Sequence, residues 1–166
     1  RAKGLVPNAV QTPLGTVRQD FTSSPNWLRV EVTNKGIYKV DAADFAAAGF
    51  PIGSIDPRTI RVFTGSGLPV LEELNPPSGW LSETAISVVG EGDGRLDGTD
   101  YVLFYGLGSS GWKDEMGAAP LDSMQRYINH PYETKNYYWL TWGGTFTNPP
   151  LRWGARNGAP ELANGA

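Results

Sequence analysis

The sequence predicts an all-β fold: a β-sandwich of about seven or more mostly antiparallel strands with one short helix. The first observation is the spacing of turn-forming residues: 21 glycines and 13 prolines fall between short apolar runs, as is typical of all-β domains. The second is alternation of apolar and polar residues with a period of two, which indicates strands with one buried face. The third is that helix capping and closing signals stand out at one short stretch.

The clearest strand signal lies at 27–33, where every second residue is apolar. Residues that tolerate positive φ follow at 34–36, and an apolar run returns at 37–40. This order predicts a β-hairpin.

The helix signal comes directly after this run. Asp41 is a suitable N-cap, Asp44 lies three residues further on, and alanines fill the chain to Ala48. Gly49 and Pro51 then close the predicted helix in the expected order.

Further strands are predicted at 59–64, 83–89, 101–105 and 137–142, with an edge strand at 151–153. The run at 101–105 is apolar on both faces, which favours a place in the middle of a sheet. Residues 106–131 are rich in Gly, Ser and charged side chains, and they are predicted to form a long loop.

The length of 166 residues fits one domain with a sizeable core. We expect a lead-in segment or edge strand at 1–20, the sandwich domain at 21–156, and a linker at 157–166 toward an absent downstream domain. We interpret the chain as a piece of a longer, processed protein.

Composition excludes several functional classes. The net charge of −3 and the lack of a basic cluster argue against nucleic-acid binding. No apolar run approaches the roughly 20 residues that span a bilayer. The chain has no cysteine and one histidine, which removes a thiol nucleophile, a zinc ribbon and a disulfide framework.

The sharpest local motif is 89–100, which matches the later positions of a twelve-residue calcium loop. Carboxylates stand at positions three, five, nine and twelve, and Gly94 stands at the sharp-turn position six. Val89 at position one cannot coordinate, and a strand rather than a helix follows. The alternative is a Gly-Asp turn whose carboxylates cap local amides. The candidate metal-binding residues are Glu91, Asp93, Arg95, Asp97 and Asp100.

Other residues offer weaker chemistry. His130 lies in a predicted loop, where hydrogen bonding to its neighbours is favoured over a role as a catalytic base. Solvated surface positions are favoured for the acids over a glycosidase pair. Aromatics could form a sugar-stacking platform, although most strand aromatics belong to cores; the residues concerned are Trp80, Trp112, Tyr132, Tyr137, Tyr138, Trp139 and Trp142.

Eight segments in order resemble one known family. They are Trp27–Val32, Gly36–Val40, Asp44–Phe50, Ile55–Phe63, Glu91–Asp97, Asp100–Gly106, Asn129–Tyr132 and Lys135–Thr141. The order is similar to the N-terminal β-domain that precedes the catalytic domain in gingipain-type cysteine peptidases and in sortase-like proteins of type IX secretion. The resemblance covers about 27–142. It departs at His130, which separates an Asn and a Pro-Tyr that run together in the family.

The resemblance implies a non-catalytic module of a secreted or cell-surface peptidase, because the family's Cys/His pair belongs to the following domain. Its implied partner is that downstream catalytic domain, which the module would hold latent, help to fold or position. Residues 107–131 are the candidate contact loop, with Lys113 and Arg126 as candidate plugs of the active cleft. Two other interpretations compete with this one. The first is an extracellular module that binds carbohydrate or another ligand and carries a structural calcium ion. The second is a hydrolase built on acidic residues.

Overall fold

The computed structural model describes residues 21–65, 67, 81–112 and 127–154, and the statements below concern these residues. The predicted segments 1–20 and 157–166 lie outside them. Within the described part of the chain, no helix is long and apolar enough to cross a membrane.

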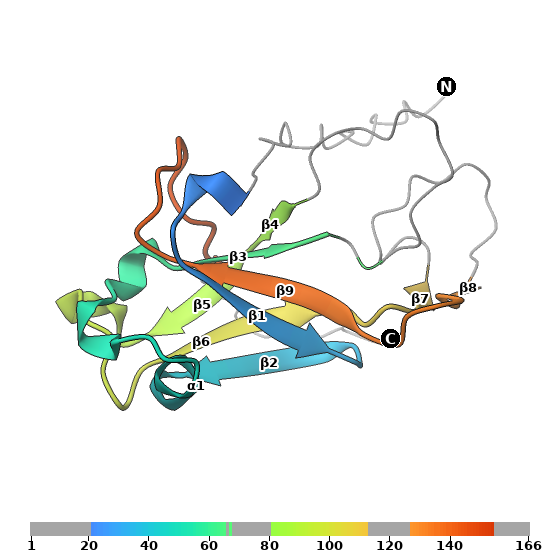
Figure 1. Cartoon of the computed structure of the whole chain (residues 1–166), viewed down its shortest axis with the longest axis horizontal. Coiled ribbons are helices and arrows are strands. Elements are labelled where there is room, and N and C mark those ends of the chain that lie inside the picture. The colour runs from blue at the N-terminus through green and yellow to red at the C-terminus, as the bar shows by residue number, and fades with distance from the viewer. Residues whose placement is uncertain (1–20, 66, 68–80, 113–126, 155–166) are drawn as a thin grey trace, which may run out of the picture.

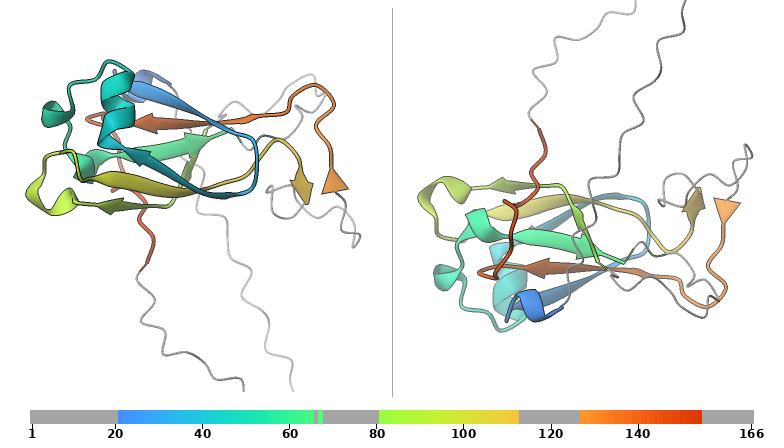
Figure 2. Two further views of the ribbon diagram at one scale, coloured as in Figure 1. Left: turned by 90° about the horizontal axis from the view of Figure 1, so that it is seen from below. Right: turned by 90° about the horizontal axis from the view of Figure 1, so that it is seen from above.

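Nine described strands form three antiparallel sheets, which confirms the predicted all-β sandwich. The four-stranded sheet has the order β1 (Trp27–Val32), β9 (Asn136–Thr141), β3 (Arg61–Thr64) and β4 (Ser82–Thr84). The three-stranded sheet has the order β2 (Gly36–Asp41), β6 (Tyr101–Gly106) and β5 (Ile86–Val89). A two-stranded ribbon, β7 (Gly111–Trp112) with β8 (Tyr127–Ile128), stands at one end, away from helix α1 (Ala42–Ala47), as Figures 1 and 2 show.

The core lies between the inner faces of the two larger sheets. Alternate residues of each strand point inward, as a period of two requires, and most are almost fully buried. Tyr138 on the central strand β9 is one of them, and burial raises the pKa of its phenol. Its hydroxyl accepts a hydrogen bond from the Leu107 N–H at 2.9 Å, so the buried polar group is satisfied. The core cluster comprises Val32, Val40, Ala42, Phe45, Ile55, Ile60, Val62, Ile86, Leu96, Val102, Phe104, Tyr138, Leu140 and Trp142.

The predicted hairpin between 27–33 and 37–40 is wrong. Strand β1 pairs with β9, whereas β2 pairs with β6 in the other sheet, so the chain crosses between layers at 33–35. The Tyr38 hydroxyl fastens this crossing, because it donates to the Asn34 carbonyl at 2.8 Å and accepts from the Asn34 N–H at 3.3 Å. An ideal Cβ on Gly106 would lie 3.0 Å from Val32 and 2.9 Å from Tyr38, so both side chains close over this glycine.

The predicted strand at 83–89 is two strands in different sheets. Strand β4 pairs with β3, and β5 pairs with β6 after a break at Ala85. Glu83 binds Arg61 in the four-stranded sheet, while Ile86 is fully buried in the core and pairs with Phe104. A single straight strand could not place both side chains in these positions.

Helix α1 follows the predicted signals. The Asp41 carboxylate accepts hydrogen bonds from the N–H groups of Ala43 and Asp44 at 3.1 and 3.3 Å. The Asp44 carboxylate accepts from the Asp41 N–H at 2.9 Å, which completes a capping box. Gly49 adopts a φ of 89° just beyond the helix, a conformation that favours glycine.

The central strands and the last edge are also confirmed. Strand β6 lies between β2 and β5, and β9 lies between β1 and β3. The predicted edge at 151–153 joins the free side of β5, where Arg152 forms a parallel bridge with Ile86. The predicted long loop at 106–131 is only partly a loop, because it contains β7 and β8.

Candidate functional site

Exposed apolar side chains gather at two places on the molecule. Among the described residues, nine large hydrophobic side chains are at least 38% exposed. One is Phe21, and three lie at the ribbon end: Trp112, Tyr127 and Tyr132. The other five belong to the outer face of the three-stranded sheet and its edge: Ile37, Val89, Tyr105, Leu151 and Trp153.

The outer face of the three-stranded sheet carries apolar residues in successive cross-strand rows. Ile37, which is 67% exposed, pairs with Tyr105, which is 44% exposed. Two residues along β6, Leu103 points to the same face, and Tyr101 beyond it pairs with Val89. Cross-strand neighbours on one face lie within about 5.5 Å of each other, so these side chains form a continuous surface.

Lys39 places a positive charge in the middle of this face. It pairs with Leu103 across β2 and β6. Its ammonium lies 4.8 Å from the centroid of the Tyr101 ring and 3.5 Å from a carboxylate oxygen of Asp41. The outer face therefore combines an apolar surface with one central cation.

The segment 150–153 extends this face beyond β5. The Ile86 N–H donates to the Leu151 carbonyl at 3.2 Å, and the Trp153 N–H donates to the Ile86 carbonyl at 2.8 Å. Because Arg152 is paired with the buried Ile86, the side chains on either side of it point the opposite way. Leu151 and Trp153 therefore continue the outer face of the sheet.

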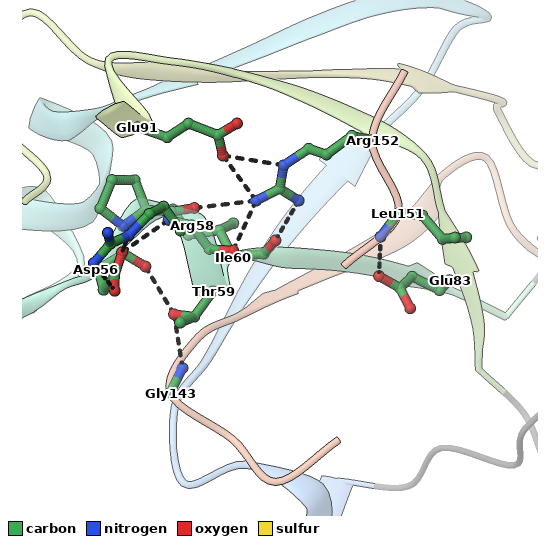
Figure 3. A network of polar contacts seen from close by, with 10 residues as sticks. Asp56, Arg58, Thr59, Ile60, Glu83, Glu91, Gly143, Leu151 and Arg152 are labelled. Atoms are coloured by element: carbon green, nitrogen blue, oxygen red, sulfur yellow. Dashed lines mark hydrogen bonds and ion pairs between the residues drawn. The ribbon is translucent and has the colours of Figure 1, made fainter. Parts of the chain in front are cut away.

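Arg152 anchors this segment, as Figure 3 shows. Its guanidinium forms two hydrogen bonds to the Glu91 carboxylate, at 3.0 and 3.1 Å. It also donates to the carbonyl groups of Ile60 and Arg58, both at 3.0 Å. One side chain thus joins the C-terminal segment to the 3₁₀ turns η3 (Pro57–Thr59) and η4 (Glu91–Asp93) and to the start of β3.

By contrast, aromatic side chains cover the outer face of the four-stranded sheet. Phe21, in the turn η1 (Phe21–Ser23), packs edge-on against Trp27 and Trp139, with centroid distances of 5.0 and 4.8 Å. Phe146 stacks on Phe63, which is fully buried. Trp27 and Trp139 therefore lie on this outer face, half-buried, and not in the core between the sheets.

A polar hollow of about 560 Å³ lies at the ribbon end. Trp112 and Tyr127 pair across the ribbon, with their rings edge-to-face at 5.5 Å, and they are 45% and 54% exposed. The remaining lining comes from the β1–β2 crossing and from the segments beside the ribbon: Thr33, Asn34, Lys35, Leu107, Ser109, Ser110, Gly111, Asn129, His130, Glu133 and Thr134.

The predicted calcium-loop residues make local bonds. Glu91 binds Arg152, Asp93 accepts from the Arg95 N–H at 3.0 Å, and the buried Asp100 accepts from the Asp97 N–H at 3.0 Å. The described residues contain no group of three or more acidic or histidine side chains that could hold a metal ion. Calcium binding here stays a prediction, and a higher melting temperature on adding calcium to the chelated protein would support it.

The pKa of Asp97 is lowered by hydrogen bonds within this loop. Its carboxylate accepts hydrogen bonds from the backbone N–H and the hydroxyl of Thr99, both at 2.9 Å. These bonds favour the charged form and lower the pKa of Asp97 below its ordinary value of 3.8.

His130 is hydrogen-bonded to its neighbours, as predicted. Its Nδ1 accepts from the N–H groups of Tyr132 and Glu133, at 3.2 and 2.9 Å. The Ser110 hydroxyl oxygen accepts from the His130 backbone N–H at 3.1 Å, so this serine bonds to the main chain of His130.

The remaining predicted residues are divided between core, surface and the undescribed part. Tyr138 and Trp142 are buried, so they form no platform for a sugar. Lys113, Arg126 and Trp80 lie outside the described residues.

Sequence reasoning missed two features. The outer apolar face was not recognised because 101–105 is apolar in both phases, so the pattern does not distinguish its inner from its outer side chains. Arg152 gave no signal, since its partners come from segments that are distant in the sequence.

The fold and these surfaces define an all-β sandwich module. No protein-family profile and no curated protein matches the chain. Among solved structures, the chain is similar to one described as the crystal structure of dimeric latent PorU from Porphyromonas gingivalis, with 21% sequence identity and a TM-score of 0.46. The match covers 79% of this chain and 10% of that chain, so the present chain spans about a tenth of its length.

Proposed function

We propose that the chain is a non-catalytic N-terminal module of a secreted or cell-surface gingipain-like cysteine peptidase. It acts by contact with the downstream catalytic domain of the same parent chain, for latency, folding or positioning. The sequence resemblance over 27–142 supports the class of parent protein. One structural observation supports action by protein contact: the open apolar face of the three-stranded sheet.

The outer face suits a folded protein partner. Soluble monomers rarely leave large contiguous apolar patches exposed, and such patches mark interaction sites. Of the nine large hydrophobic side chains that are exposed among the described residues, five share this face and its edge. A partner with an apolar patch would bury these side chains, and a carboxylate opposite Lys39 would add a second anion to its ion pair with Asp41.

The chain's own residues favour a non-catalytic role. The sequence has no cysteine, so the nucleophile of a cysteine peptidase would have to come from another domain. The acceptor nitrogen Nδ1 of His130 is occupied by two backbone N–H groups, and no described serine hydroxyl is bonded to it.

Lys113 and Arg126 are the proposed plugs of the active cleft. They flank the described ribbon in sequence, directly after Trp112 and directly before Tyr127. A basic side chain presented there could enter a specificity pocket while the sheet face supplies most of the binding free energy.

The test is binding of this chain to the separately folded catalytic domain of its parent, measured by calorimetry. The double variant Ile37→Ser/Tyr105→Ser removes the centre of the apolar face and is expected to weaken binding by roughly a hundredfold. Arg29→Ala on the opposite sheet is the matched control and should bind like the wild type. The variant Lys113→Ala/Arg126→Ala should bind but inhibit the peptidase less.

Two outcomes would overturn the proposal. Absence of binding between the two folded pieces would remove the contact function altogether. Unchanged binding of the Ile37→Ser/Tyr105→Ser variant would show that the partner docks elsewhere, and the outer face would lose its role.

A further inference from the structure

We propose that the hollow at the ribbon end is a binding site for a neutral saccharide. This site is distinct from the apolar sheet face, and the inference does not depend on the proposed contact with a peptidase domain. It rests on the size of the hollow, its exposed aromatic rim, its polar lining, its charge balance and its fixed walls.

The size and the rim fit a short sugar chain. A volume of about 560 Å³ lies within the range of roughly 300–1,000 Å³ that is usual for small-molecule sites. Trp112 and Tyr127 present exposed rings at the edge of the hollow. Sugar rings expose C–H groups that pack on aromatic faces, so the two rings offer a place for one pyranose.

The lining supplies hydroxyl and amide groups that match sugar hydroxyls. Thr33, Asn34, Asn129 and Thr134 all line the hollow and are exposed. Asn129 is exposed, and its side-chain amide, which carries both donors and an acceptor, makes no hydrogen bond with any other described residue. A saccharide hydroxyl can both donate and accept, which suits such a group.

The charge of the lining favours a neutral ligand. One cation, Lys35, and one anion, Glu133, stand in the lining and balance each other. The Glu133 carboxylate already accepts from the N–H groups of Thr134 and Lys135, at 2.9 and 3.1 Å. A phosphate or a polyanion would find no cationic cluster among the described residues that line the hollow.

The walls are fixed by bonds within the protein. The buried Ser109 hydroxyl donates to the Glu133 carbonyl at 2.9 Å, which joins the two segments beside the ribbon. Gly108 lies so close to the β1–β2 crossing that an ideal Cβ would lie 2.4 Å from the Thr33 carbonyl oxygen. A hollow held in this way loses little conformational freedom when a ligand binds.

The experiment titrates the ¹⁵N-labelled chain with trisaccharides and follows the indole N–H signals by NMR. The probes are cellotriose, mannotriose and N,N′,N″-triacetylchitotriose, with trigalacturonate as the anionic arm. The spectrum of Trp112→Phe assigns the Trp112 signal. We expect one neutral trisaccharide to shift this signal in a saturable manner.

Variants separate the hollow from the rest of the surface. Trp112→Ala should weaken the binding roughly tenfold or more, and Asn129→Ala should weaken it by a smaller factor. Val89→Ser, at the end of the outer sheet face that lies away from the ribbon, should bind like the wild type. Thermal melts confirm that each variant is folded, which is expected because Trp112 and Asn129 are exposed.

Three results would overturn the inference. One is a flat titration of the Trp112 signal with every probe up to its solubility limit. Another is binding that survives Trp112→Ala undiminished. The third is binding of trigalacturonate alone, which would replace the neutral ligand with an anionic one.

Discussion

At the scale of single residues, Asp100 organises the turn that the sequence marked as a metal loop. Its buried carboxylate accepts the Asp97 N–H and fills the space beside Gly90. Gly90 has a φ of 93°, and an ideal Cβ there would lie 1.7 Å from the Asp100 Oδ1. A side chain at position 90 would therefore strain the backbone and displace a buried carboxylate at once.

We predict that Gly90→Ala lowers the free energy of unfolding by about 2–4 kcal/mol. Denaturant unfolding measures this change. Gly98→Ala is the matched control in the same loop, because nothing lies within 4 Å of its ideal Cβ and its φ is not in the left-handed region. Equal effects of the two substitutions would contradict the role given to Asp100.

The lowered pKa of Asp97 predicts that its contribution to the stability of the fold depends on pH. Its pKa in the folded protein is lowered, chiefly by the bond from the Thr99 backbone N–H, so its stabilising contribution is complete above its ordinary value of 3.8. The contribution is lost as the pH falls through the lower folded value. Asp97→Asn should therefore melt at a lower temperature than the wild type at pH 6, and the difference should shrink progressively as the pH falls below 3.8. All melts are run in the presence of chelator. A difference in melting temperature that did not change with pH would contradict this account.

At 91–100, the sequence motif predicted the turn but not the partners of its side chains. The spacing of carboxylates at 91–100 identified the turn and its sharp glycine at Gly94, which has a φ of 76°. The spacing could not show the direction of each side chain. Glu91 extends to Arg152, some sixty positions away in the chain, and such a partner is set by tertiary structure.

At the scale of elements, Arg152 makes the segment 150–153 part of the sheet. Its side chain is only a quarter exposed, and its guanidinium binds one carboxylate and several main-chain carbonyls. We predict that Arg152→Ala lowers the free energy of unfolding by about 2–3 kcal/mol, because buried carbonyl groups and Glu91 lose a charged partner.

The control for this prediction is Arg29→Ala. Arg29 is 55% exposed and lies 3.8 Å from Glu31, so its loss should cost less than about 1 kcal/mol. Hydrogen exchange adds a local readout: the Trp153 N–H, which is bonded to Ile86, should exchange faster in Arg152→Ala. Unchanged protection of this amide would show that the segment is held by other contacts.

Elements were predicted more successfully than their partners. Alternation of apolar and polar residues identified β1, because a strand with one buried face imposes a period of two, whereas short apolar runs between turn residues marked β2, β6 and β9. Alternation is the same whether the next strand is in the same sheet or the opposite one. In the sequence, the β1–β2 crossing at 33–35 therefore resembles a hairpin. The structure shows a crossing instead, because β1 pairs with β9, β2 pairs with β6, and the Tyr38 hydroxyl bonds to Asn34 within the crossing.

At the scale of the whole molecule, the two sheets differ in what covers them. In the described part of the chain, the four-stranded sheet has an aromatic cover on its outer face, whereas the three-stranded sheet carries exposed apolar side chains on its outer face. A sandwich needs one buried face per sheet, and that face is already supplied by the common core. The apolar residues on the outer face are therefore expected to contribute less to folding than the core residues do, which leaves them available for the proposed contact.

Neighbouring residues on β6 test this division, because Val102 faces the core and Leu103 faces outward. Val102 is fully buried and pairs with Val40 and Val88, so Val102→Ala should cost about 2–3 kcal/mol of unfolding free energy. Leu103→Ala removes more atoms but from a half-exposed position, and it should cost less than about 1.5 kcal/mol. Binding should follow the opposite order, since Leu103→Ala weakens attachment to the catalytic domain while folded Val102→Ala retains it. If Leu103→Ala proved the more destabilising of the two and left binding intact, the outer face would belong to the folding of the domain and not to its function.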